Sequence, residues 1–315
     1  MIYTLTLNPA IDRELTVPEM EFDTVLRASE CRLDFGGKGF NVSRLLKGMD
    51  TDSTAVGFLG GRAGDLLQDG LHAIGIGTDF VWVPGETRTN VSVVTSSHSH
   101  YLKVNEKGPL VDADKQGELL RKIDTLAQPG DWWVLAGSLP PGVPDDYYAS
   151  IVSILNQHQS KAILDTSGES LRLGCAKAPF LVKPNVEEAQ LLTGLPMETP
   201  AEVATAAAKI RGIGAQNVVI SLGKAGALLQ TADASWLIHS PHVHEKNPIG
   251  AGDSMVGGMV WALTRGLALK EALGWGVASG AATASLSGTE VGSRPLIEEL
   301  LLQIRYESFE TIQGK

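Results

Sequence analysis

The sequence predicts an α/β fold in which helices cover a mainly parallel sheet and a smaller antiparallel sheet projects from it. Two observations lead to this prediction. From about Asp131 onward, short apolar runs alternate with helical stretches, an order typical of a parallel sheet with helices on its faces. By contrast, residues 11–34 and roughly 78–104 contain strand-like pieces with polar alternation and no convincing helix, which indicates strands with one solvated face.

The expected strands of the main sheet are near-continuous apolar runs, as in strands buried on both faces. They are residues 2–7, 53–58, 132–136, 162–165, 180–182 and 218–221. Expected helices between them include 185–193 and the alanine-rich 200–212. The smaller sheet could serve as a lid over a site or be an ordinary edge hairpin, and the pattern alone fits both.

Composition limits the classes of protein to which this chain could belong. Of 315 residues, 43% are hydrophobic and 20% are charged, which is ordinary for a globular protein. The formal net charge of -10 argues against binding nucleic acid or anionic membranes, but a small phosphorylated ligand needs only a few local cations. Cys31 and Cys175 lack the spacing of a metal site or a disulfide framework. With no signal-peptide pattern or membrane-length apolar run, we expect a cytoplasmic protein.

The most informative stretch runs from Asn247 to Leu263, where glycines precede a helical pattern. Glycines let backbone N–H groups at a helix start turn toward an anion, and the helix dipole favours negative charge there. Asp253 stands at this helix start, where a carboxylate can accept the proton of an attacking hydroxyl during phosphoryl transfer. Alternatively, Asp253 only caps the helix and the glycines form a tight turn.

Two further stretches combine a turn with polar side chains. Residues 36–39 are glycine-rich and open a helix, with Lys38 and Asn41 offering a cation and an amide, although a plain strand-to-helix turn would look the same. After the strand at 180–182, Asn185 is the expected helix cap and Glu188 has the spacing of a capping box. The functional alternative is that these two residues organise hydrated Mg²⁺.

Together these motifs resemble the ribokinase-like carbohydrate kinases (the PfkB family), in particular the 1-phosphofructokinase and tagatose-6-phosphate kinase branch. The resemblance runs from Leu5 to at least Gly280 and rests on residues 5–12, 36–41, 57–61, 87–90, 136–142, 182–188, 219–223 and 250–256. It implies one kinase domain over residues 1–315, with a three-layer α/β/α fold and a mainly parallel central sheet. The lid would comprise segments 11–34 and 78–104, and in this family it often pairs with the lid of a second subunit, so a homodimer is expected.

The resemblance also implies roles for individual residues. Asp253 would be the catalytic base, and the backbone of Gly250, Ala251 and Gly252 would hold the transferring phosphoryl charge. The ATP-binding residues would be Lys183, Asn185, Ser221 and Gly223, with Asn185 and Glu188 near Mg²⁺. The residues that bind the sugar hydroxyls would be Asp12, Gly36, Gly37 and Asn41. The residues near the existing phosphate of the substrate would be Lys38, Arg88, Ser138 and, if the lid closes, Arg27.

The expected reaction is phosphorylation of fructose 1-phosphate by ATP, giving fructose 1,6-bisphosphate. Tagatose-6-phosphate kinase and 6-phosphofructokinase activities are alternatives, because the sequence does not place the candidate cations in space. A non-catalytic sugar-phosphate sensor is an alternative of another class. The joint presence of Asp253, Asn185 and Glu188 speaks against it, since binding alone does not need a base. A nicotinamide enzyme is disfavoured because Met255 stands at the third glycine position of the dinucleotide fingerprint.

Overall fold

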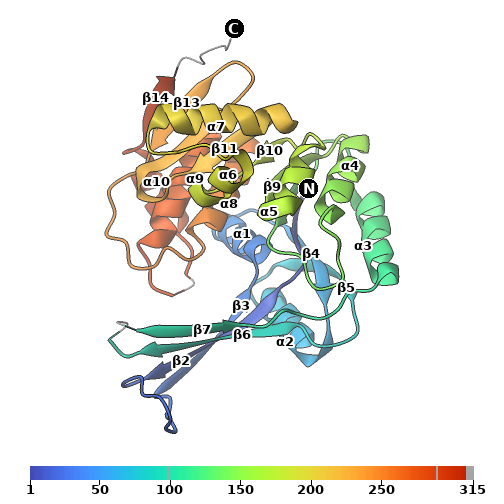
Figure 1. Cartoon of the computed structure of the whole chain (residues 1–315), viewed down its shortest axis with the longest axis vertical. Helices are drawn as coiled ribbons and strands as arrows, with labels where there is room; N and C mark the ends of the chain where they lie inside the picture. Colours follow the sequence, from blue (N-terminus) through green and yellow to red (C-terminus); the bar gives the residue numbers. More distant parts are fainter. Residues whose placement is uncertain (98–99, 289, 310–315) are drawn as a thin grey trace.

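A computed structural model describes residues 1–97, 100–288 and 290–309. A large α/β part carries a small sheet that projects from one end (Figure 1). The strands of the main sheet are β1 (Ile2–Thr6), β4 (Thr54–Leu59), β5 (Gly77–Trp82), β8 (Trp132–Ala136), β9 (Lys161–Asp165), β10 (Leu181–Val182), β11 (Asn217–Ser221), β12 (Gly226–Gln230), β13 (Ser235–His239) and β14 (Arg305–Phe309). The strands of the small sheet are β2 (Ala10–Val17), β3 (Glu30–Gly36), β6 (Arg88–Thr95) and β7 (Tyr101–Asn105).

Helices connect most strands of the main sheet. They are α1 (Lys38–Gly48), α2 (Gly61–Ala73), α3 (Ala113–Leu126), α4 (Tyr147–Gln157), α5 (Gly168–Cys175), α6 (Val186–Thr193), α7 (Pro200–Ile213), α8 (Ala251–Leu263), α9 (Leu269–Ala284) and α10 (Arg294–Leu301), with a 3₁₀ turn at Gly223–Ala225. Within the described residues, no helix has both the length and the apolar character needed to cross a bilayer.

The main sheet is mainly parallel, as predicted. Its strand order is β14-β13-β12-β11-β10-β9-β8-β1-β4-β5, and all neighbours from β11 to β5 run parallel. The expected apolar strands all form, within a residue or two of their predicted ends. At the other edge, β12, β13 and β14 are antiparallel additions that the sequence pattern did not indicate.

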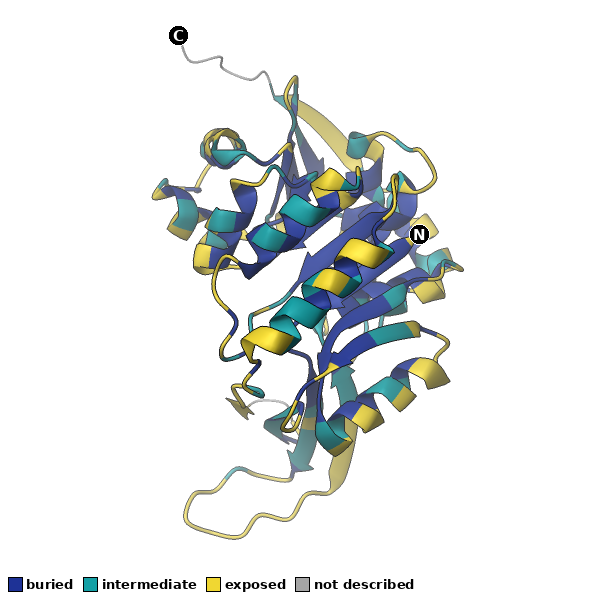
Figure 2. Ribbon diagram, turned by 90° about the vertical axis from the view of Figure 1, so that its right-hand side faces the viewer, coloured by how far each residue is buried: buried dark blue, intermediate teal, exposed yellow. Residues whose placement is uncertain are grey.

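Helices cover both faces of this sheet and complete the predicted three layers. Trp132 and Trp133 are neighbours in β8, yet they pack into two different apolar clusters, because successive side chains of a strand point to opposite faces. The Trp133 cluster includes residues of α3 to α7, and the Trp132 cluster includes residues of α1, α8, α9 and α10. Figure 2 shows the buried strands between the two helical layers.

The small sheet departs from the prediction in two respects. Its order is β3-β2-β6-β7, and the central pair β2–β6 is parallel, so the sheet is mixed rather than antiparallel. The expected segment 78–104 also begins too early, because β5 (Gly77–Trp82) pairs with β4 in the main sheet. Phe80 and Val81 are adjacent and both buried, which is the pattern of a strand covered on both faces. Residues 98 and 99 of that segment lie outside the described residues.

Helices α1 and α8 begin beside each other at one edge of the sheet. Their packing against each other should contribute strongly to stability. Leu45 of α1 is fully buried, and a Cβ built on Gly257 of α8 would lie 2.7 Å from its Cδ2 atom. We predict that Leu45→Ala lowers the free energy of unfolding by about 2–5 kcal/mol in urea denaturation. Leu302→Ala, at a side chain with 87% exposure, should change it by about 0.5 kcal/mol or less. Equal effects of the two substitutions would contradict this packing.

Candidate active site

The first turn of α8 forms the centre of the candidate site. Gly250, immediately before it, has φ 78°, in the left-handed region that glycine adopts without strain. Asp253 lies in this turn with only 8% of its surface exposed. Asn41, from the first turn of α1, donates a 2.8 Å hydrogen bond from Nδ2 to Asp253 Oδ2. The starts of two helices that are distant in sequence therefore meet at this carboxylate.

Burial raises the pKa of the Asp253 carboxyl to about 6, and repulsion from the Asp165 carboxylate acts in the same direction. The hydrogen bond from Asn41 and the charges of Lys38 and Lys183 act against this rise. A carboxylate with this pKa is mainly ionised at neutral pH but holds a proton better than an ordinary aspartate. That combination suits a general base.

Asp165, at the end of β9, pairs with two lysines beside that turn. Its Oδ1 lies 3.0 Å from Lys38 Nζ and its Oδ2 lies 3.2 Å from Lys183 Nζ. Burial acts to raise the pKa of Asp165, but the two ammonium groups outweigh burial and hold the pKa below its usual value. Lys183 also lies against the start of α8, since a Cβ built on Gly252 would be 3.5 Å from its Nζ. The two ammonium groups are thus held beside the start of α8, where the backbone N–H groups of the helix also favour binding of an anion.

Sequence reasoning missed Asp165, which it treated only as the last residue of a strand. The signal was present: Asp165 follows an apolar run, as Lys183 follows the next one. Parallel strands end at the same edge of a sheet, and that edge is where ligands bind in open α/β folds. A charged residue at such an end is therefore a site candidate.

Asn185 and Glu188 form the expected capping box at the start of α6. Glu188 N donates to Asn185 Oδ1 (2.8 Å), and Asn185 N donates to Glu188 Oε2 (2.9 Å). The Glu188 carboxylate is near enough to Lys38 for its charge to help raise the pKa of that lysine. Carboxylate and amide oxygens fit the donor preference of Mg²⁺. Among the described residues, no group of three or more His, Cys, Asp or Glu could hold an ion, so such an ion would need water and phosphate oxygens as well.

A further carboxylate, that of Asp12 in β2, lies at the junction of the small sheet and α1. Asn90 Nδ2 donates a 2.8 Å hydrogen bond to Asp12 Oδ1. A Cβ on Gly36 would lie 2.1 Å from Asp12 Oδ2, so only glycine allows this close approach. Gly37 is similarly confined, since a Cβ there would lie 2.7 Å from Phe40 Cδ2. The expected residues Asp12, Gly36 and Gly37 are thus neighbours.

The predicted phosphate-binding residues have different surroundings. Arg88 donates hydrogen bonds to the carbonyl oxygens of Asn8 (2.8 Å) and Glu106 (3.2 Å), tying the start of β6 to the loops around it. Ser138 is exposed after β8, next to Gly137, whose N–H donates to the carbonyl of Asp165 (3.0 Å). Arg27 is exposed, and the loop from β2 to β3 that carries it lies at the free end of the small sheet (Figure 1).

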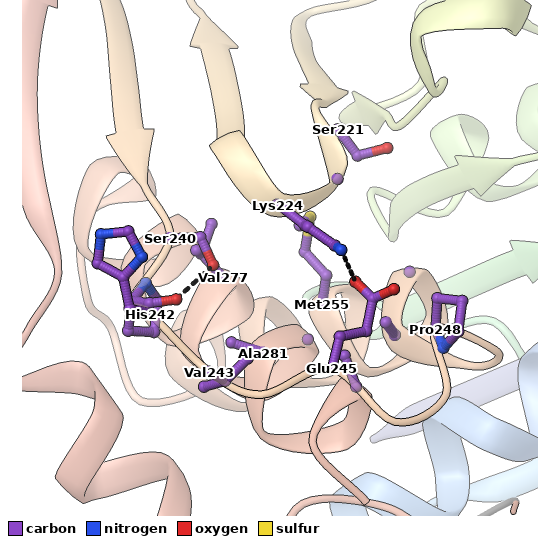
Figure 3. Close-up of a pocket in the computed structure, with 16 residues that line it drawn as sticks. Ser221, Lys224, Ser240, His242, Val243, Glu245, Pro248, Met255, Val277 and Ala281 are labelled. Atoms are coloured by element: carbon purple, nitrogen blue, oxygen red, sulfur yellow. Dashed lines mark hydrogen bonds and ion pairs between the residues drawn. The ribbon is translucent and has the colours of Figure 1, made fainter.

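A pocket of about 280 Å³ adjoins the start of α8 (Figure 3). Ser221 and Gly223, the residues expected on the nucleotide side, line it together with Ala251 and Gly252. One wall consists of small or apolar side chains, and the residues of that wall are Val243, Met255, Val277, Gly280, Ala281 and Ala284. Lys224 and Glu245 form a 3.7 Å ion pair at the pocket. Sequence reasoning missed the segment from Ser240 to Glu245, because it has neither helical nor strand periodicity.

Removing the carboxylate shared by the two lysines should destabilise the fold. Lys183 is only 4% exposed, so Asp165→Asn would leave a buried ammonium group without its counter-charge. We predict a loss of about 3–5 kcal/mol in the free energy of unfolding, measured by urea denaturation. Asp52→Asn breaks the exposed pair with Lys47 and should cost less than about 1 kcal/mol. A loss at Asp165 no larger than that of the control would rule out this role.

Comparisons with known proteins agree with the geometry. A family model described as pfkB family carbohydrate kinase matches residues 4–295. The 1-phosphofructokinase of Bacillus subtilis is 36% identical over 305 residues, which cover 97% of this chain and 99% of that protein. A tagatose-6-phosphate kinase of Staphylococcus epidermidis is 33% identical over 266 residues, covering 84% of this chain and 85% of the relative.

Among solved structures, the phosphofructokinase-2 from Escherichia coli in complex with potassium matches with a TM-score of 0.91 at 30% identity, covering 96% of this chain and 98% of that chain. The resemblance drawn from the sequence motifs is therefore confirmed, as is the expectation of an enzyme. The chain belongs to the pfkB family of carbohydrate kinases, a family that implies the use of ATP.

Proposed function

We propose that this chain phosphorylates a ketohexose phosphate with Mg²⁺-ATP, converting fructose 1-phosphate to fructose 1,6-bisphosphate. The observation that carries the proposal is the buried Asp253 at the start of α8, hydrogen-bonded to Asn41 and flanked by the lysine pair on Asp165. A base, a helix start and two cations in one place are the parts that phosphoryl transfer needs.

In the proposed reaction, Asp253 accepts the proton of the attacking sugar hydroxyl as its oxygen bonds to the γ-phosphorus, and the bond from that phosphorus to the β–γ bridging oxygen breaks to release ADP. The N–H groups of residues 250–252, with Lys183, stabilise the charge on the transferring group. The nucleotide occupies the pocket lined by Ser221 and Gly223. Asn185 and Glu188 would hold Mg²⁺ through water, and the metal would offset charge on the phosphates.

On the sugar side, the proposed hydroxyl ligands are Asp12, Gly36, Gly37 and Asn41. The proposed contacts of the existing phosphate are Lys38, Arg88, Ser138 and a lid-borne Arg27. Fructose 1-phosphate is preferred because full-length relatives bear the name 1-phosphofructokinase. Tagatose 6-phosphate is the second candidate, supported by the relative named tagatose-6-phosphate kinase, and fructose 6-phosphate is the third.

We also propose that the small sheet is a lid that pairs with the lid of a second copy of this chain. One row of paired residues crosses all four strands on the face that points away from Asp12. In strand order, its members are Leu33, Arg13, Val91 and Val104. Within this row, the side chains of Leu33 and Val104 are 48% and 56% exposed. Exposed apolar side chains that share one face of a sheet mark a surface for association. The same sheet of a second copy could cover this face, and the exposed Arg27 loop would then lie near the dimer interface.

The proposal places the protein in the cytoplasm and includes no nucleic-acid or membrane partner. Support comes from the net charge of -10, which gives no general attraction to anionic polymers or surfaces. Cys31 and Cys175 are both free thiols, as expected for a reducing compartment.

The substrate assignment is tested by ADP release from Mg²⁺-ATP with fructose 1-phosphate, fructose 6-phosphate or tagatose 6-phosphate as acceptor. The expected result is the highest kcat/KM with fructose 1-phosphate. A higher value with one of the 6-phosphates would transfer the assignment to that substrate. Folded protein that turns over none of the three would support the sensor alternative.

The assignment of Asp253 predicts a pH dependence. Below about pH 6 its carboxyl is protonated and cannot accept the hydroxyl proton, so kcat/KM should fall about tenfold per pH unit. Asp253→Asn should lower kcat by at least about 100-fold while ATP binding measured by calorimetry changes little. A pH profile that is flat between about pH 5 and 8, or an Asn variant with unchanged kcat, would refute the role of Asp253 as the base.

Pairing of the lids predicts that a charge on the apolar face prevents association. Val104→Asp should shift the mass measured by light scattering from dimer to monomer, because the carboxylate would be buried without a partner. Leu302→Asp, at an exposed leucine after α10, should leave the dimer intact. A monomeric wild-type protein, or a dimer that survives the Val104 substitution, would count against lid pairing.

A further inference from the structure

The side chain of Asn90 is unusual for its position on a small, largely exposed sheet. It lies on β6, directly opposite Asp12 of β2, and only 8% of its surface is exposed. Its Nδ2 donates a 2.8 Å hydrogen bond to Asp12 Oδ1. Its Oδ1 is buried with no hydrogen-bond partner among the described residues.

Stability alone does not explain an asparagine at this place. A buried acceptor without a partner destabilises the folded state, and asparagine is a poor strand former. A β-branched apolar residue of similar size would suit the strand better and would leave no acceptor unpaired. The presence of asparagine is therefore explained by the other half of its amide, the N–H group that donates a hydrogen bond to Asp12.

That hydrogen bond distinguishes the two oxygens of Asp12. Oδ1 is directed to Asn90, whereas Oδ2 lies over Gly36, where a Cβ would come within 2.1 Å of it. Gly36 leads into α1, which carries Asn41 and through it contacts Asp253. The other oxygen of Asp12 thus lies on the Gly36 side of the carboxylate, where the chain leads into α1 and the candidate site.

A competing attraction acts on the same carboxylate. The guanidinium of Arg44 interacts electrostatically with Asp12 and Asp34. Arg44 itself is held by the Phe35 carbonyl (2.9 Å) and more weakly by Asn41 Oδ1 (3.4 Å). Without the amide of Asn90, Asp12 would be free to rotate toward Arg44 and turn its oxygens away from the sugar.

We propose that Asn90 is a positioning residue of the sugar site, whose amide holds Asp12 with Oδ2 turned toward the hydroxyls of the substrate. The inference rests on the proposed function, in which Asp12 binds those hydroxyls. Asn90 acts through Asp12 and touches neither ATP nor the reacting atoms. Its loss should therefore affect binding of the sugar phosphate and leave the nucleotide site unchanged.

The test compares Asn90→Val with wild type in steady-state kinetics and thermal unfolding. The KM for the sugar phosphate should rise roughly 10- to 100-fold, as for loss of a hydrogen bond to a charged group, with the KM for ATP and kcat changing less than about twofold. The melting temperature should change little, because removal of the unpaired acceptor offsets the loss of the hydrogen bond to Asp12. Asn90→Ser, which keeps a shorter donor, should show an intermediate rise and provides a second variant if the valine protein folds poorly.

Ser92→Val is the matched control, since Ser92 lies two residues further along the same strand and on the same face. It should leave both KM values unchanged. An unchanged sugar KM in Asn90→Val would overturn the inference, and so would a fall in melting temperature with equal losses for both substrates, which would indicate a structural role. Wild-type protein that turns over no ketohexose phosphate would overturn the proposed function, and the inference with it.

Discussion

The salt bridges from Lys38 and Lys183 to the buried Asp165 join three separate parts of the chain at one edge of the sheet. Asp165 ends β9, Lys183 follows β10, and Lys38 begins α1. Lys183 is buried, and the carboxylate compensates its lost solvation, whereas 40% of the Lys38 side chain stays exposed. The result is a pair of cations beside the first turn of α8. Burial is the main cause of the raised pKa of Asp253; the charge of Asp165 adds to the rise, and the two lysines act against it.

The small sheet combines two surfaces of different chemistry on one set of strands. Alternation along β2 and β6 places Asp12 and Asn90 on one face and Arg13 and Val91 on the other. In the proposed function the first face binds the sugar, and the second, which combines the exposed apolar side chains of Leu33 and Val104 with Arg13, pairs with a second copy. A single β-sheet would then link recognition of the substrate to association with that copy, because any movement of the sheet carries both faces with it.

Much of the fold followed from local patterns. Apolar runs such as residues 132–136 identified the parallel strands, and the glycines before Asp253 identified the helix start that forms the site. The features that the sequence did not predict depend on contacts between distant parts of the chain. Residues 78–82 fall within the expected lid segment because only their pairing with β4 shows that they belong to the main sheet. No local pattern reveals that β2 and β6 pair in parallel. Asp165 was overlooked because its role exists only once Lys38 and Lys183 are brought to it.

The central claim is that Asp253 faces the hydroxyl of the sugar while Asp12 holds its other hydroxyls. A crystal structure with Mg²⁺, a non-hydrolysable ATP analogue and fructose 1-phosphate would test it most directly. The expected result is the C6 hydroxyl within hydrogen-bond distance of Asp253, with Asp12 Oδ2 contacting ring hydroxyls and the C1 phosphate directed toward the lid side. A sugar bound with its phosphate against Asp253, or with no hydroxyl within reach of that carboxylate, would contradict the claim.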